Sequence, residues 1–533
     1  MLVTMALVLG GLVVVMGATV VARRTGLPAA VLMVVAGVGY GFLPGPNLEL
    51  DSEVVLALVI PPLLYAAALQ SSLTALRGHA REVGGLSVGL VLATALAVGF
   101  GLSATVPAVT LSVGVAIGAA VAPPDPVAAL SIGRRAGLPP RLTTLVEGEG
   151  LLNDATALTI LKVALAAVAG GAFSLRGAVA EFLLMAVGGL VVGVVLAVVL
   201  ARVRTAVTDA LVDNALSLAS PFAAYLAAEA LHVSGVLAVV VVGLWLGHRN
   251  PSVQSGQARL QTRAVWRLVE FLLEGYVFVL IGQQLPTVVG GLAAYPLRTI
   301  VPAAVVTVGI VLLLRPLWLL VFAHLPARLH ARLGGDPDEG NLPLSGREVI
   351  ALSWAGTRGV ITLAAAYSLP HDLPARDLLL FCAYLVVLVT LVGQGLTFGP
   401  LLRRLRLGGA EVARALTRNE ARVAALEAGL QRLEAMLESE PELDEVIVPV
   451  RRATEARRLR YADRVALLSS MEDDDEVPVD DRYLAAVRVR REMIIAEREE
   501  LLAWRDAGWL PDADLRVLER ALDHEEIVLP PAP

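Results

Sequence analysis

The feature that most constrains this chain is a succession of apolar runs, each roughly 17–25 residues long, that fills the sequence from its start to about residue 402. An α-helix rises ~1.5 Å per residue, so about 20 apolar residues cross the ~30 Å hydrocarbon core of a bilayer. Of the 533 residues, 56% are hydrophobic and 17% are charged, whereas soluble domains are about 25% charged. The sequence therefore predicts an all-α polytopic membrane protein.

We count about thirteen such runs as transmembrane helices. They cover residues 2–21, 28–43, 54–70, 84–106, 108–130, 143–169, 177–200, 209–231, 233–248, 262–284, 297–322, 346–369 and 377–402. After the last run the sequence becomes dense in Arg, Glu and Asp. The chain is therefore divided into a transmembrane domain, residues 1–402, and a C-terminal tail, residues 403–533.

The tail is predicted to be helical. Segments 425–437 and 483–504 have helical apolar spacing, and the acidic stretch 471–478 between them is interpreted as a solvated linker. Such a tail is either a solvated or dimer-contacting appendage or a regulatory sensor. It contains no phosphate-binding loop, dinucleotide fingerprint or cluster of metal ligands, so we expect no cofactor and no nucleic-acid partner.

Arginine is distributed unevenly over the connections between the runs. The odd-numbered connections and the start of the tail contain Arg23, Arg24, Arg77, Arg81, Arg134, Arg135, Arg141, Arg202, Arg204, Arg249, Arg259, Arg263, Arg328, Arg332, Arg347, Arg403, Arg404 and Arg406. The even-numbered connections contain at most one each (Arg176, Arg298, Arg376). Because cytoplasmic connections retain basic residues, the N-terminus is predicted outside and the tail in the cytoplasm. The first run has no basic n-region and no cleavage site, so it is expected to remain as a helix.

The sixth run concentrates ionisable residues, each of which costs at least about 2.5–3.5 kcal/mol inside a bilayer. Glu147 and Asp154 are seven residues apart and share one helix face, whereas Glu149 and Asn153 share another. A helix that is polar on two faces is expected inside the bundle, with Asp154 roughly 16 Å deep, close to the middle of the bilayer. Asn153 and Asp154 could instead join helices by hydrogen bonds, but an acid at this depth needs something that neutralises it.

The fifth run contains Pro123, Pro124 and Pro126 around Asp125. Each proline removes a backbone donor and clashes with the preceding turn, so the helix is predicted to be discontinuous, with Asp125 capping its second half. Irregular backbone at this depth is tolerated where it is buried or lines a cavity. Asp125 is therefore a candidate for a structural cap and for an ion contact, and the two roles are compatible.

The twelfth run contains Arg358 at about the depth of Asp154, with Gly356 and Gly359 beside it, where a helix could break. A buried guanidinium needs a carboxylate or several carbonyls. Glu149 is the first candidate partner and Asp125 the second.

The two predicted breaks lie seven runs apart. Two six-helix repeats, runs 1–6 and 8–13, would place both breaks in the fifth helix of a repeat. An odd offset inverts one repeat relative to the other, and in that arrangement broken helices cross at a central site.

The other charged residues within the runs are given structural interpretations. Lys162 is expected to snorkel or to pair structurally, and the alternative is that it is the charge partner of the site. Asp213 and Glu229 are near the ends of runs and are interpreted as interfacial or capping residues. Glu270 and Glu274, one turn apart, could form a helix–helix contact.

Six segments, in order along the transmembrane domain, resemble one known family. They are PPLLY (61–65), PDPVA (124–128), EGEGLLNDATA (147–157), SGVLAVVVVGL (234–244), FVLIG (278–282) and WAGTRG (354–359). On these motifs the chain resembles the cation:proton antiporter-1 group of monovalent cation/proton exchangers, particularly its bacterial Na⁺/H⁺ branch, and the tail is also similar to that branch.

The resemblance implies a homodimer in the bacterial cytoplasmic membrane, in which a core domain moves against a dimerisation domain. It implies that Asp154 binds the cation or the proton, that Asn153 and Asp125 support it, and that Arg358 belongs to a charge network beside it. We include Glu149 and Glu147 in that network.

The chain departs from the family pattern at three positions. Pro124, Gly150 and Ala66 stand where many members have Thr, Ser and an acid, side chains that help to coordinate cation in some relatives. The ligand set, and with it the preference between Na⁺, K⁺ and Li⁺, is therefore left open.

These residues suggest a mechanism of exchange. A bare carboxylate is costly to move through the membrane, whereas one neutralised by H⁺ or Na⁺ is not, so competition for Asp154 couples the two ions. Asn153 is neutral, so one charge is carried each way and exchange is predicted to be electroneutral. The alternatives are a K⁺/H⁺ antiporter, a cation channel, for which no filter sequence is found, and a membrane enzyme, for which the seven histidines form no cluster.

Overall fold

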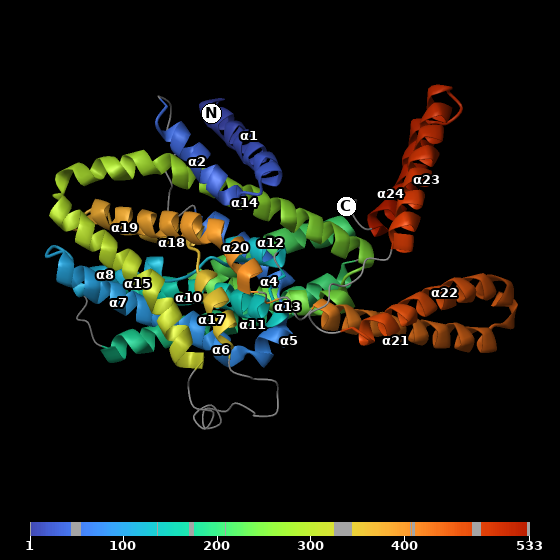
Figure 1. Ribbon diagram of the computed structural model, residues 1–533, viewed down its shortest axis with the longest axis horizontal. Helices are drawn as coiled ribbons and strands as arrows, with labels where there is room; N and C mark the ends of the chain where they lie inside the picture. The colour runs from blue at the N-terminus through green and yellow to red at the C-terminus, as the bar shows by residue number, and fades with distance from the viewer. Residues whose placement is uncertain are drawn as a thin grey trace, which may run out of the picture. The chain divides into compact units, whose positions relative to one another are not determined.

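The computed structural model describes residues 2–43, 55–135, 137–169, 175–207, 209–323, 344–405, 407, 411–471 and 481–529. Every regular element in these ranges is a helix, so the predicted all-α class is confirmed (Figure 1). The chain forms two compact units, 1–407 and 408–533, and each is described by itself. Residues 472–478 of the predicted linker and the loop arginines Arg328, Arg332 and Arg406 lie outside the described ranges.

Helices lie over all of the apolar runs in the first unit. In chain order they are α1 (Leu2–Thr25), α2 (Ala29–Gly41), η1 (Val55–Val59), α4 (Ile60–Gln70), α5 (Leu73–Gly78), α6 (Ala80–Gly84), η2 (Gly85–Leu90), α7 (Val91–Thr105), α8 (Leu111–Val121), α9 (Pro126–Arg135), α10 (Pro140–Val168), α11 (Leu175–Ala206), α12 (Ala210–Ala230), α13 (Gly235–Val253), α14 (Gly256–Gly291), η3 (Leu292–Ala294), α15 (Leu297–Ala323), α17 (Gly346–Trp354), α18 (Val360–Tyr367), α19 (Arg376–Leu388), η4 (Val389–Gln394) and α20 (Gly395–Leu405). Here η1, η2 and η4 are π-helical turns and η3 is a 3₁₀ turn.

Five helical stretches in the described part of the chain are long and apolar enough to cross a membrane. They are Ala80–Thr105, Pro140–Val168, Val179–Ala206, Leu297–Val321 and Arg376–Leu405. Shorter apolar helices lie at Ala29–Gly41, Ala57–Gln70, Leu111–Val121 and Gly235–Arg249. The fifth and twelfth predicted runs are each divided into two short helices, so neither forms one continuous helix of membrane-spanning length.

Helix α14 is longer than its apolar run predicts, 36 residues against the run 262–284. Its first turns are polar, and the Ser255 hydroxyl caps them by accepting the Ala258 backbone N–H. Hydropathy marks only the apolar part of such a helix, whereas the cap determines where the helix begins.

The first unit contains two groups of helices that pack mainly within themselves. We call α1, α2, α4 and α11–α14 the scaffold bundle, and α6–α10, α15 and α17–α20 the core bundle. The bundles meet where α10 packs on α4, α11 and α13, and where α14 packs on α18 and α19. Within the scaffold bundle, Gly37 of α2 and Gly282 of α14 allow close backbone contact, because a Cβ at either position would overlap the facing backbone.

The second unit is made of helix pairs. Helix α21 (Glu411–Ser439) packs on α22 (Asp444–Ser469), and α23 (Asp481–Asp506) packs on α24 (Asp512–Val528). The predicted helical segments 425–437 and 483–504 lie within α21 and α23.

Candidate functional site

Two interrupted helices meet in the core bundle. Residues 122–125 separate α8 from α9, and residues 355–359 separate α17 from α18. The Asp125 backbone N–H donates to the Thr357 carbonyl at 2.6 Å, and the Thr357 hydroxyl donates to the Asp125 carbonyl at 2.9 Å. The irregular segments of the two interrupted helices therefore contact each other directly, and their backbone groups partly satisfy one another's hydrogen-bonding needs. We call this contact between residues 122–125 and 355–359 the crossing.

The interruption before α9 follows from its prolines. Pro123 and Pro124 have no backbone N–H to donate to the preceding turn, and α9 begins at Pro126, where a missing N–H costs nothing. The Asp125 carboxylate accepts the Val127 backbone N–H at 2.9 Å and so caps α9.

Arg358 lies at the ends of the preceding half-helices and is 2% exposed. Its Nε and Nη2 donate to the carbonyls of Val121 (3.2 Å) and Ala122 (3.1 Å), and its Nη1 donates to the Gly356 carbonyl. These carbonyls follow the last turns of α8 and α17, so a positive charge lies where two helix dipoles are negative. Arg358 therefore stabilises the crossing from one side.

The predicted pairing of Arg358 with Glu149 is wrong. Glu149 instead forms a two-pronged ion pair with Arg315 of α15, in which Nη2 and Oε2 are 2.8 Å apart. The Arg315 Nε also donates to the Leu352 carbonyl at 2.9 Å. The Arg358 guanidinium donates its hydrogen bonds to backbone carbonyls in place of a carboxylate. It also lies within electrostatic range of Glu149 and Arg315. Arg315 was not predicted as the partner, although an Arg deep within the run 297–322, far from the Arg298 at its start, was a usable signal.

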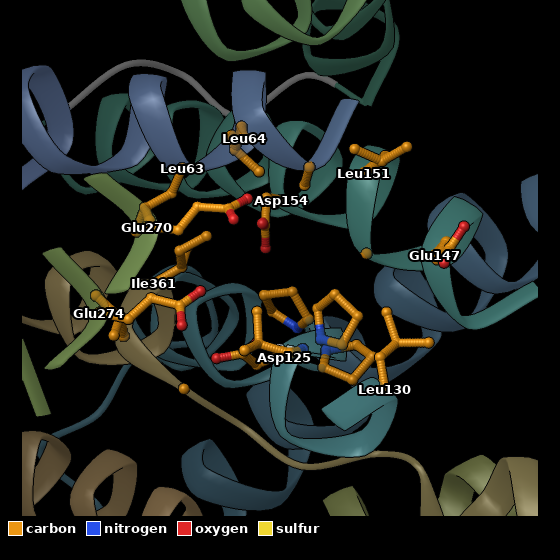
Figure 2. Close-up of a pocket in the computed structure, with 18 of the residues that line it drawn as sticks. Leu63, Leu64, Asp125, Leu130, Glu147, Leu151, Asp154, Glu270, Glu274 and Ile361 are labelled. Carbon is orange, nitrogen blue, oxygen red and sulfur yellow. Dashed lines mark hydrogen bonds between the residues drawn. The ribbon is translucent and has the colours of Figure 1, made fainter. Parts of the chain in front are cut away.

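A cavity of about 290 Å³ lies between the two bundles beside the crossing (Figure 2). The carboxyl groups that line it belong to Asp125, Glu147, Asp154, Glu270 and Glu274, and no basic side chain is among its described lining residues. Asp154 is 4% exposed. In the part of the chain that the structure describes, the carboxyl groups of Asp154 and Glu274 have no hydrogen-bond or ion-pair partner.

The two polar faces of α10 have different partners, as their spacing predicts. Glu147 and Asp154 line the cavity. On the other face Glu149 pairs away from it, and the Asn153 Nδ2 donates to the Pro124 carbonyl at 2.9 Å. Asn153 thus ties α10 to the interruption before α9 and does not itself line the cavity.

Glu270 and Glu274 could form a helix–helix contact according to their spacing, but the spacing does not predict that both line the cavity. Both extend from α14 into the cavity, on the side opposite the core bundle (Figure 2). The Gln70 Nε2 of α4 donates to both carboxylate oxygens of Glu270, at 3.1 and 3.3 Å. Only the tertiary packing of α14 against α18 and α4 brings these acids to the cavity.

Packing explains two small residues at the crossing. A Cβ at Gly150 would overlap the ring of Pro126, so a serine would not fit at this position. A Cβ at Gly359 would overlap the Asp125 carboxylate. Ala66, in contrast, is 1% exposed and does not line the cavity, so the small side chain at this position does not enlarge the cavity.

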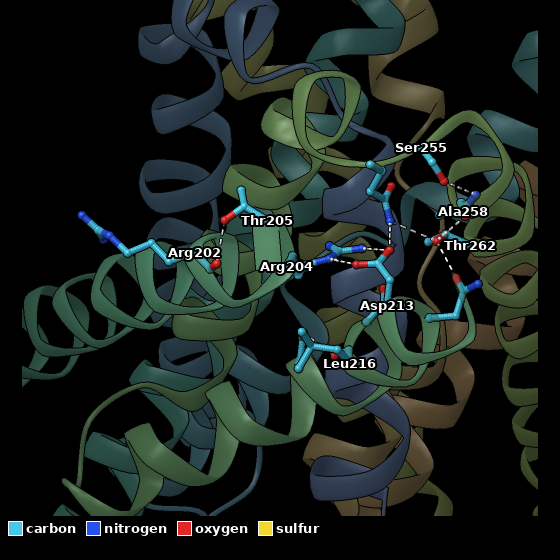
Figure 3. Close-up of polar contacts among 12 residues, drawn as sticks. Arg202, Arg204, Thr205, Asp213, Leu216, Ser255, Ala258 and Thr262 are labelled. Atoms are coloured by element: carbon cyan, nitrogen blue, oxygen red, sulfur yellow. Dashed lines mark hydrogen bonds and ion pairs between the residues drawn. The ribbon is translucent and has the colours of Figure 1, made fainter. Parts of the chain in front are cut away.

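Two further ion pairs lie outside the cavity lining. Arg204 binds Asp213 through two contacts of 2.7 and 3.0 Å, and Gln254 donates to the same carboxylate (Figure 3). Asp213 does not cap α12, whose N-cap is Asp209, so the capping interpretation is wrong. Asp213 is buried and joins α11 and α12 to the turn that follows α13. The Lys162 Nζ is 2.9 Å from Glu229, which confirms a structural pairing for Lys162.

Among the described residues, no group of three or more His, Cys, Asp or Glu is placed to hold a metal ion.

Comparisons with known proteins identify the family. Residues 11–404 match the family model "Sodium/hydrogen exchanger, transmembrane". An uncharacterized Na⁺/H⁺ exchanger of Mycobacterium tuberculosis is 30% identical over 96% of this chain and 93% of its own length. A sodium, potassium, lithium and rubidium/H⁺ antiporter of Bacillus subtilis is 30% identical over 69% of this chain and 56% of its own length.

The fold has a solved counterpart. The sodium proton antiporter of Methanocaldococcus jannaschii has a TM-score of 0.59 and 19% identity, over 75% of this chain and 98% of that protein. This family and this fold are those of multi-pass membrane transporters rather than enzymes. The chain belongs to the transmembrane sodium/hydrogen exchanger family.

Proposed function

We propose that this protein exchanges Na⁺ for H⁺ across the bacterial cytoplasmic membrane by alternating access, with Asp154 as the group that binds either ion. The observation that carries the proposal is the cavity: five carboxyl groups line it, no basic side chain is among its described lining residues, and Asp154 has no protein partner in the described chain. Buried negative charge requires compensation, and small cations or protons can supply it.

Exchange follows from the position of Asp154 between two bundles. Asp154 belongs to the core bundle, and the cavity wall opposite it belongs to the scaffold bundle. Moving the core bundle with a bare carboxylate would be costly, whereas the same movement with Na⁺ or H⁺ bound is not. The site therefore moves in one direction with Na⁺ bound and in the opposite direction with H⁺ bound. Asn153 and Asp125 support the site by fixing α10 to the interruption and by capping α9.

One charge is proposed to move per half-cycle. Within the core bundle, Glu149 is balanced by Arg315, and Arg358 is balanced by the carbonyls at two helix ends. Of the adjacent residues Asn153 and Asp154, only Asp154 is an acid, so only Asp154 gains and loses a cation. One Na⁺ for one H⁺ leaves the net charge moved at zero.

The preferred cation is proposed to be Na⁺, with K⁺ and Li⁺ as alternatives. The printed name of the Bacillus subtilis relative includes sodium, potassium, lithium and rubidium, so more than one cation is compatible with this family. A K⁺/H⁺ antiporter is therefore the second candidate, with the same site and mechanism.

The wider architecture is proposed on the same basis. We propose thirteen membrane spans in two inverted six-helix repeats, the N-terminus outside, a helical cytoplasmic tail from residue 403, and a homodimer in the lipid bilayer. The paired interruptions in α8–α9 and α17–α18 support the repeats.

The cavity is proposed to open toward the cytoplasm. Its lining residues Ser71 and Ser131 lie in the Arg-rich third and fifth connections, which are proposed to be cytoplasmic.

The exchange assay tests the proposal directly. In proteoliposomes that enclose a pH-sensitive dye and carry a pH gradient, adding Na⁺ is expected to dissipate the gradient. The rate should be the same with and without valinomycin at equal K⁺ on both sides, because an electroneutral cycle does not respond to the membrane potential. Adding Na⁺, K⁺ and Li⁺ separately gives the cation preference.

Two outcomes would contradict parts of this proposal. Cation flux that proceeds downhill without proton movement would identify a channel. A rate that rises when valinomycin clamps the potential would identify electrogenic exchange and remove the one-for-one stoichiometry.

The orientation predicts opposite labelling of two exposed arginines after substitution by cysteine. Arg202 is on the last turns of α11 and Arg298 is at the start of α15. We expect Arg202→Cys to react with a membrane-impermeant maleimide only in inside-out vesicles and Arg298→Cys only in right-side-out vesicles. The native Cys382 is buried and provides an unreactive background. The reverse pattern would invert the proposed topology.

A further inference from the structure

The cavity contains a second carboxyl group without a protein partner, and it belongs to the other bundle. Glu274 extends from α14 of the scaffold, whereas Asp154 extends from α10 of the core (Figure 2). Its neighbour Glu270 is held by Gln70, at 3.1 and 3.3 Å, but Glu274 accepts no hydrogen bond from any described residue. Glu274 lies within electrostatic range of Asp125 and Glu270, both also acids.

A second observation points to a ligand here. Thr362 of α18 lines the same cavity and is 1% exposed, and its hydroxyl has no hydrogen-bond partner in the described chain. An unpaired buried hydroxyl costs free energy that a bound group would recover. Carboxylate and hydroxyl oxygens are hard ligands, which suit Na⁺ and Li⁺.

We propose that Glu274 is a second carboxylate ligand of the transported cation, and that it contacts the cation only in the conformation in which the core bundle has its present position. The inference rests on the exchange function proposed above and adds a residue to its ion site. Because Glu274 belongs to the scaffold bundle, it would stay behind when the core bundle carries Asp154 and its ion to the other face.

Two consequences follow from a ligand that does not travel. Glu274 raises cation affinity at one membrane face only, because a contact made in one state stabilises only that state. It also adds no transported charge, so a site with two carboxylates remains compatible with one-for-one exchange. The face concerned is the cytoplasmic one in the proposed orientation.

The test is the Glu274→Gln substitution, which removes the charge and keeps the shape. The KM for Na⁺ is measured in inside-out and in right-side-out vesicles, where the ion reaches opposite faces. We expect KM to rise about tenfold at the cytoplasmic face, the effect of losing one charge-assisted contact, and to stay within about twofold at the other. Glu274→Asp, which keeps the charge, should recover part of the affinity.

The matched control is Glu181→Gln, an exposed acid of α11 in the scaffold bundle that does not line the cavity. It should leave KM unchanged at both faces. An equal rise at both faces in Glu274→Gln, or no rise at either, would overturn the proposal. If wild-type protein shows no exchange, the proposed function fails instead, and the two failures are thereby distinguished.

Direct ligation is separated from a general electrostatic effect by selectivity. A ligand fits Na⁺ and Li⁺ differently, so Glu274→Gln should change the ratio of their KM values at the cytoplasmic face. A distant negative charge attracts both ions alike and would weaken both to the same extent. A ratio unchanged within error would therefore contradict ligation by Glu274.

Discussion

Replacing Asp154 by asparagine is expected to reduce Na⁺-driven proton movement in proteoliposomes to the level of protein-free liposomes. An amide neither binds nor releases a proton in the physiological range, and its neutral oxygen is a poorer cation ligand than a carboxylate. Asp154 is 4% exposed, lines the cavity and has no partner among the described residues, so no structural contact is lost with the charge. The measurement is dye dequenching after addition of Na⁺ under a fixed pH gradient.

The matched control makes the same chemical change outside the cavity. Asp209 is exposed and caps α12 by accepting the backbone N–H groups of Leu211 and Val212, a role that asparagine fulfils equally well. Asp209→Asn should therefore exchange at the wild-type rate. Removing an unpaired buried charge should not destabilise the fold, so Asp154→Asn should unfold at no lower a temperature than wild type. Substantial exchange by a folded Asp154→Asn protein would remove Asp154 from the mechanism.

The parts of the site that sequence could predict are those that depend on neighbours along the chain. Three prolines around Asp125 dictate a broken helix whatever packs beside it. The seven-residue spacing of Glu147 and Asp154 dictates a shared helix face, and both residues line the cavity. Motif order along the chain was sufficient to indicate the family that the family model confirms.

The parts that sequence missed depend on contacts between distant helices. Glu149 and Arg315 are 166 residues apart, and their pairing follows from the packing of α15 and α17 beside α10. Arg358 was expected to need an acid, but the helix ends supply enough carbonyl oxygens to satisfy it. Glu274 reaches the cavity only because α14 packs on α18. Residue spacing within one helix contains no information on any of these contacts.

The second large effect concerns the buried ion pair between Arg315 and Glu149. Arg315→Met keeps most of the side-chain volume but leaves the Glu149 carboxylate, 1% exposed, without its counter-charge. Leaving one member of a buried pair unpaired costs about 3–5 kcal/mol. We expect a clear fall in the midpoint of thermal unfolding in detergent, followed by the fluorescence of the purified protein. Arg298→Met makes the same substitution at an exposed position of α15 and should change stability by no more than about 0.5 kcal/mol.

The double variant Glu149→Gln with Arg315→Met decides what the pair contributes. If the loss in Arg315→Met comes from an uncompensated charge, neutralising Glu149 should restore most of the stability, because a neutral buried pair is often no worse than an ionic one. The Leu352 carbonyl would still lack the hydrogen bond that the Arg315 Nε donates at 2.9 Å, so recovery should be incomplete. If the double variant is instead no more stable than Arg315→Met, the arginine acts through packing and through the end of α17, and the charge on Glu149 is compensated by Arg358.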